Sequence, residues 1–153
     1  MLSLTSPRIT NFFAPLVLYE LFYRLSGIPV MIARGNHDAH LEAMLSGFMN
    51  VEIGKEILIG EYAFMHGNSL PSADALKRGY IVVGHGHSAA NVNGVDVKAW
   101  VIARPGSSMK KKYKAYNKKI RLVVVPAFNR MIVGTRIGNS SNLPLFRSGV
   151  FDI

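Results

Sequence analysis

Three apolar stretches of this chain run directly into glycine and histidine, and this pattern restricts the possible folds more than any other feature. IPVMIAR precedes Gly35, YAFM precedes His66, and YIVV precedes Gly84. Short apolar runs rich in β-branched residues are typical of strands buried on both faces. Residues 11–26 have apolar side chains at helical spacing and end before Gly27 and Pro29. The sequence therefore predicts an α/β fold with polar loops after its strands.

The remaining segments predict further elements. LEAMLSGF at 41–48 favours a short helix capped by Asn36 or Asp38, residues 51–67 favour short strands joined by a turn, and residues 71–78 favour another helix. The alternating segments 95–104, 120–128 and 131–137 predict antiparallel strands. Residues 138–153 predict a closing loop that packs through four apolar side chains, Leu143, Leu145, Phe146 and Phe151.

Composition excludes several classes of protein. The chain has no cysteine, which rules out disulfides, thiolate metal sites and cysteine nucleophiles and favours a reducing compartment. Its start lacks the features of a signal peptide, and its most apolar stretch is shorter than the roughly 20 residues that span a bilayer. We therefore expect one cytoplasmic domain over residues 1–153 that does not enter a membrane.

The histidines carry the chemistry that the sequence predicts. The chain has five, His37, His40, His66, His85 and His87, and four of them follow a predicted strand within two residues of a glycine. Ligands of open α/β sheets bind outside the carboxyl ends of the strands, so these loops can converge. In extended backbone His85 and His87 would point to the same side. Nitrogen ligands together with an amide oxygen from Asn36 suit manganese, iron, zinc or nickel.

Three motifs, GNHD at 35–38, HGN at 66–68 and GHGH at 84–87, resemble in their order and spacing those of the calcineurin-like metallophosphoesterases. VKAWVIARPG and RLVVVPAFNRMIVGT further resemble the C-terminal region of the predicted phosphoesterases called ICC-like. The resemblance implies a two-sheet sandwich with flanking helices. It also implies hydrolysis of a phosphomonoester or phosphodiester at a centre of two divalent metals, for which manganese is the expected ion and iron, zinc and nickel are alternatives.

The resemblance assigns roles residue by residue. Asn36, His66 and His85 would bind one metal, and His87 would bind its neighbour. His37 would be the catalytic histidine, and Asp38 would orient it by accepting its second N–H. A competing interpretation makes Asp38 a helix N-cap, which is compatible with that role. For His40 we prefer a structural position at the start of the helix.

The chain departs from the family pattern in its first half. The family's Asp-x-His and Gly-Asp-x-x-Asp motifs, which supply the bridging carboxylate, are absent upstream of GNHD. We therefore expect the N-terminal strands to be missing, the chain to carry half of the active site, and at most one metal to bind. The alternative is a non-catalytic remnant or a binding module with a basic nucleic-acid-binding loop.

A basic cluster lies in the second half, with Tyr113 and Tyr116 interleaved. Its members are Lys110, Lys111, Lys112, Lys114, Lys118, Lys119 and Arg121, in a chain with a formal charge of +9. The first three are candidates for substrate phosphate, and the whole cluster is a candidate for nucleic acid. We prefer a solvated hairpin loop. The N-terminal aromatic residues are predicted to be core and not a binding surface, unless the missing strands leave them exposed: Phe12, Phe13, Tyr19, Phe22 and Tyr23. The sequence leaves the substrate and the oligomeric state open.

Overall fold

The computed structural model of this chain describes residues 17–129, 131–136 and 143–153. These residues form a mixed α/β structure, which confirms the predicted fold class. The described chain divides into two compact units: unit 1 holds residues 17–32 and 37–54, and unit 2 holds residues 33–36 together with those from 55 onward. The single domain over residues 1–153 stays a prediction.

Unit 1 combines two helices with a two-stranded sheet. Its elements are a helix over residues 17–24, α2 (Leu41–Leu45), β1 (Val30–Ala33) and β2 (Val51–Gly54). Phe22 and Leu45 are buried, and the rings of Phe22 and Phe48 lie 5.9 Å apart. The Asn50 amide donates hydrogen bonds to the carbonyls of Leu25 and Ile28. These contacts tie the end of the first helix to the start of β2.

Three predictions for unit 1 are wrong. β1 is not buried on both faces, since Met31 is 49% exposed; within the described chain β1 pairs only with β2. Tyr19 and Tyr23 are also exposed, because only one side of their helix packs inward. The N-cap of α2 is His40, not Asn36 or Asp38, and it makes no side-chain capping bond. The predicted helical residues 11–16, including Phe12 and Phe13, lie outside the described residues.

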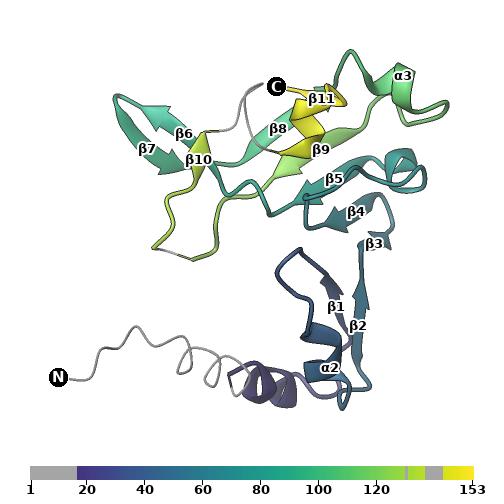
Figure 1. The fold of residues 1–153 in the computed structure, drawn as a ribbon, viewed down its shortest axis with the longest axis vertical. Coiled ribbons are helices and arrows are strands. Elements are labelled where there is room, and N and C mark those ends of the chain that lie inside the picture. The colour runs from purple at the N-terminus through teal and green to yellow at the C-terminus, as the bar shows by residue number, and fades with distance from the viewer. Residues whose placement is uncertain (1–16, 130, 137–142) are drawn as a thin grey trace. The chain divides into compact units, whose positions relative to one another are not determined.

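Unit 2 is built on a six-stranded sheet in the order β11-β8-β9-β5-β4-β3 (Figure 1). The strands are β3 (Glu56–Ile59), β4 (Tyr62–Met65), β5 (Tyr80–Val83), β8 (Val101–Pro105), β9 (Arg121–Val124) and β11 (Phe151–Asp152). β4, β5 and β9 are parallel to one another, whereas β3 and β8 run antiparallel to their neighbours. The carboxyl ends of the three parallel strands therefore lie at one edge.

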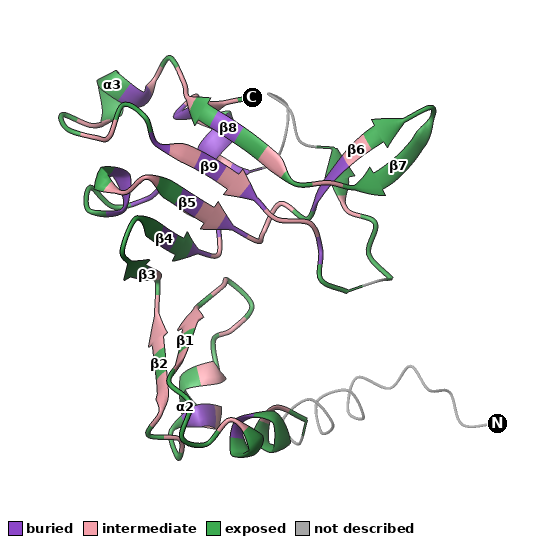
Figure 2. Ribbon diagram, turned by 180° about the vertical axis from the view of Figure 1, so that it is seen from behind, coloured by how far each residue is buried: buried purple, intermediate pink, exposed green. Residues whose placement is uncertain are grey.

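One face of this sheet carries the core, and burial alternates along the strands (Figure 2). The inward side chains pack with the helical segments η1 (Ala75–Lys77), α3 (Met109–Lys112) and α4 (Pro144–Arg147). On the other face Tyr62 stacks on Phe64 and on Tyr80, at ring distances of 6.0 and 5.2 Å. All three rings are more than one-third exposed. The alternation is what a sheet with one packed face requires.

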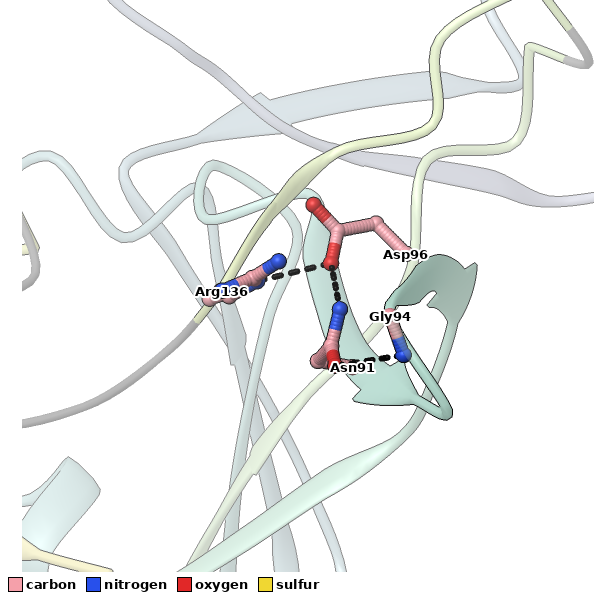
Figure 3. A network of polar contacts seen from close by, with 4 residues as sticks. All are labelled: Asn91, Gly94, Asp96 and Arg136. Carbon is pink, nitrogen blue, oxygen red and sulfur yellow. Dashed lines mark hydrogen bonds and ion pairs between the residues drawn. The ribbon is translucent and has the colours of Figure 1, made fainter.

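A second sheet has the order β10-β6-β7 and consists of β6 (Ser88–Val92), β7 (Val95–Lys98) and β10 (Thr135–Arg136). β6 and β7 form an antiparallel hairpin, and β10 pairs parallel with β6. Asp96 accepts hydrogen bonds from Asn91 and Arg136, while Asn91 accepts one from the amide of Gly94 (Figure 3). Two hydrogen bonds hold the pKa of Asp96 below its ordinary 3.8. The one from Asn91 has the larger effect, and the one from Arg136 is second. Asp96 is therefore charged at neutral pH.

The structure corrects the predicted strands of the second half. Residues 95–104 are not one strand, because the chain leaves β7 at Ala99 and enters a different sheet as β8. β6 was not predicted, and the described part of 131–137 contains only the two-residue β10. The predicted helix at 71–78 is the single turn η1. The four apolar residues of the closing segment are buried as predicted, although they lie on α4 and β11 or beside them.

Ile81→Val tests the core of unit 2. Ile81 is fully buried on the central strand β5, so we expect a loss of about 0.5–1.5 kcal/mol in the free energy of unfolding. Ile59→Val is the matched control, since Ile59 is 48% exposed on β3 and should change stability much less. Urea unfolding followed by the fluorescence of Trp100 measures both, and equal losses would contradict the assigned core.

Candidate functional site

Two adjacent loops at the carboxyl edge of the sheet carry predicted site residues. His66 directly follows β4, and residues 84–87 directly follow β5. The backbone amides of Gly84 and His85 both donate to the carbonyl of His66, at 3.1 and 2.8 Å. Because β4 and β5 are paired in parallel, the two loops leave the sheet side by side.

Asn36, His66 and His85 lie together in unit 2. His66 Nε2 is 3.0 Å from Asn36 Oδ1. In this hydrogen bond the imidazole N–H donates and the amide oxygen accepts. The rings of His66 and His85 are 4.6 Å apart and tilted by 52°. Both histidines are half-buried, and Asn36 is exposed. Three of the predicted ligands are thus neighbours, although they come from segments far apart in the sequence.

Glycines make this close arrangement possible. A Cβ on Gly35 would lie 2.8 Å from Cε1 and Nδ1 of His66. Gly67 has a φ of +110°, and a Cβ there would lie 3.0 Å from Val83 Cβ and 3.4 Å from His85 Cβ. At both positions a side chain would crowd these neighbours, and glycine avoids that contact.

His87 does not have the predicted extended conformation. Its φ is +42°, and its amide donates to the carbonyl of Gly84, so residues 84–87 form a turn. His85 and His87 therefore do not lie two apart on an extended strand, and the same-side arrangement predicted for them is wrong. A left-handed backbone at a residue other than glycine costs of order 1–3 kcal/mol and persists only where neighbouring contacts impose it. The side chain of His87 is exposed.

His37 and Asp38 belong to unit 1, where His37 is exposed and Asp38 is half-buried. The carbonyl of Asp38 accepts a hydrogen bond from the amide of Leu41 at the first turn of α2. Their catalytic and orienting roles stay predictions. His40 is exposed at the start of α2, the position that the sequence predicted for it.

The donor atoms around His66 suit one divalent ion. Two ligand atoms at right angles on an octahedral ion, each about 2.1 Å from it, lie about 3 Å apart. The separation of His66 Nε2 and Asn36 Oδ1 is 3.0 Å, and the His85 ring is adjacent. Among the described residues, no group of three or more His, Cys, Asp or Glu could hold a metal. A metal at Asn36, His66 and His85 would therefore take mixed nitrogen and oxygen ligands, and its binding stays a prediction.

The model of the family described as calcineurin-like phosphoesterase matches residues 4–139 of this chain. The chain belongs to the calcineurin-like phosphoesterase family. No curated protein and no solved structure matches it. In the described part of this family member, no helix has both the length and the apolar character needed to cross a membrane.

The basic cluster of this family member lies away from the histidines. The segment from 106 to 120 joins β8 to the amino end of β9 and includes the short helix α3, so it is not a simple hairpin loop. Asn117 binds the carbonyls of Leu76 and Arg78, just before β5 begins. The four residues of β5 span roughly 13 Å, which separates this segment from the loop that follows the strand. The structure therefore does not bring Lys110, Lys111 and Lys112 to the histidines.

The tyrosines of the basic cluster are not arranged to stack on bases. Tyr113 and Tyr116 pack against the core of unit 2. The Tyr113 hydroxyl donates to the carbonyl of Pro71, and burial raises the pKa of this phenol above its ordinary 10.0. The lysines are exposed. These observations favour the solvated-loop interpretation of the basic cluster.

Two residues that support the site were not singled out from the sequence. Ser88 is fully buried, and its hydroxyl bonds to the carbonyls of Ala99 and Val124, at 2.6 and 3.0 Å. It thereby anchors the chain immediately after His87. Gly134 lies against the backbone of His87. The position of Ser88 directly after GHGH was the available signal, whereas nothing local in the sequence marks Gly134.

Gly35→Ala tests the packing of His66. The new Cβ would overlap the imidazole, so we expect the ring to move and its contact with Asn36 to be lost. Gly47→Ala is the matched control, because a Cβ there meets nothing within 4 Å and neither glycine has a positive φ. NMR spectra of the imidazole C–H groups should shift for His66 and His85 in the first variant alone. Unchanged His66 resonances in Gly35→Ala would refute the assigned packing.

Proposed function

We propose that this chain is a metal-dependent phosphoesterase whose first metal ligands are Asn36, His66 and His85. The observation that carries the proposal is the convergence of an amide oxygen and an imidazole nitrogen at 3.0 Å beside a second imidazole. Membership in the calcineurin-like family supplies the reaction class. His87, in the turn that contains His85, is the proposed ligand of the second ion of the family's dinuclear centre.

The bound metals would polarise the phosphoester and lower the pKa of water, which is the chemistry that such ions supply in phosphoesterases. The chain's own residues then position these ions and handle the proton of the leaving group. We assign His37 the donation of a ring proton to the leaving oxygen, and Asp38 the acceptance of the second N–H of His37. Manganese is the proposed ion, with iron, zinc or nickel as alternatives, and a phosphomonoester or phosphodiester of the cytoplasm is the proposed substrate.

His85→Ala tests the metal site. Removal of one of three ligands should weaken manganese binding at least about tenfold and lower the hydrolysis of bis-p-nitrophenyl phosphate with it. His40→Ala is the control, since His40 is exposed in unit 1 and has no proposed role in binding. Calorimetric titration with manganese measures binding, and release of nitrophenolate measures turnover.

The same experiment separates the proposed function from its alternative, a binding module without turnover. The chain contains no Gly-Asp pair, so the family's bridging carboxylate has no counterpart in its sequence. If the unsubstituted chain binds no manganese and hydrolyses no ester at saturating metal, the phosphoesterase proposal is refuted for this chain and the binding module is favoured.

His37→Ala should give a different result from His85→Ala. Loss of a general acid typically lowers turnover by 10²–10⁴-fold, whereas it removes none of the proposed ligands. We therefore expect manganese binding close to that of the unsubstituted chain and a large fall in kcat. A loss of metal equal to that in His85→Ala would contradict the division of roles.

A further inference from the structure

The backbone of His87 is held by hydrogen bonds on both sides. Its amide donates to the carbonyl of Gly84 at 3.2 Å, and its carbonyl accepts from the amide of Thr135 at 2.9 Å. The first bond is local to the turn. The second comes from a segment nearly fifty residues later in the chain. A left-handed residue that is not glycine needs such support, and Thr135 supplies it from outside the turn.

Gly134 allows the distant segment to come this close. Its φ is +109°, and a Cβ built on it would overlap the carbonyl oxygen of His87 and lie 3.6 Å from Ala89 Cβ. Any other residue here would push residue 135 away from His87 or force the turn to open. Gly134 therefore meets two demands at once, a left-handed backbone and contact with a carbonyl group.

Side-chain contacts anchor the same segment to the β6–β7 hairpin. Thr135 and Arg136 are in register with Ser88 and Ala89, so pairing begins immediately after His87. Arg136 Nε lies 2.7 Å from Asp96 Oδ1, and Asn91 binds the same oxygen at 3.0 Å (Figure 3). Asp96 thus joins β10 to the hairpin through its side chain, in addition to the backbone pairing.

We propose that residues 134–136, here named the 134–136 strap, are a positioning element that fixes the left-handed backbone of His87 and so directs its imidazole. This role rests on the proposed function, in which His87 is a ligand of the second metal. Gly134 provides the close approach, Thr135 binds the His87 carbonyl, and Arg136 holds the strap on the hairpin. None of the three touches substrate or metal in this proposal; they act through His87.

Gly134→Ala, studied in the metal-free chain, tests the strap directly. We expect the backbone amide and imidazole resonances of His87 to shift, and the amide hydrogen of Thr135 to exchange at least about tenfold faster as its bond is lost. Gly94→Ala is the matched control. Gly94 has a similar φ of +87°, but a Cβ there meets nothing within 4 Å, so this variant has the backbone strain without the overlap. The two variants together isolate the contact with His87.

Arg136→Met provides a second test if Gly134→Ala does not fold. Loss of the ion pair in Arg136→Met should shift the same His87 and Thr135 resonances by a smaller amount than Gly134→Ala does. Arg136→Lys keeps the positive charge, so its resonances should lie closer to those of the unsubstituted chain. Lys77→Met is its control, because Lys77 forms an equally short exposed pair with Asp74 away from the strap. If His87 has the same resonances in the strap variants as in their controls, the proposal is overturned.

These readouts need neither metal nor turnover, so they separate the strap from the proposed function. A chain with no manganese binding and with shifted His87 resonances would refute the phosphoesterase and leave the mechanical role of the strap in place. A chain that binds manganese and hydrolyses the ester, with unshifted His87 resonances in Gly134→Ala, would refute the strap alone. In an active chain, Gly134→Ala should also lower kcat more than Gly94→Ala does.

Discussion

The parallel pairing of β4 with β5 is the interaction on which the candidate site depends. It places the carboxyl ends of the two strands at one edge of the sheet, so that the carbonyl of His66 accepts hydrogen bonds from both Gly84 and His85. The imidazoles of His66 and His85 then lie 4.6 Å apart. The core beneath the sheet supports this pairing, since Met65 and Val83, the last residues of the two strands, are buried in register.

Glycines set the distances within the site. Gly35 leaves the space that the His66 ring occupies, and Gly67 lets the chain turn beside His85. Gly134, just before β10, leaves space for the carbonyl of His87. At Gly35 and Gly134 a methyl group would overlap the His66 ring or the His87 carbonyl, and at Gly67 it would crowd Val83 and His85. The geometry of the site therefore depends on residues without side chains as much as on the proposed ligands.

The sequence predicted much of this arrangement because the signals were local. Apolar runs that end in glycine and histidine placed His66 and His85 after β4 and β5, and the order of GNHD, HGN and GHGH indicated the family that the comparison confirmed. Predictions failed where a partner distant in the chain decided the outcome. The single strand predicted at 95–104 is divided because its halves pair with β6 and β9. The lysines of α3 lie toward the amino end of β5, whereas His85 follows its carboxyl end.

The sequence by itself determined the α/β class, the family and the identity of the candidate ligands, since these depend on residue types and on their spacing along the chain. Tertiary structure alone decided which of them meet: Asn36 contacts His66 across thirty positions, and Thr135 binds the carbonyl of His87. It also decided the left-handed conformation of His87, which extended-strand spacing had not predicted. The physical reason is that a contact between distant segments depends on strand pairing and register, which no local pattern of residues contains.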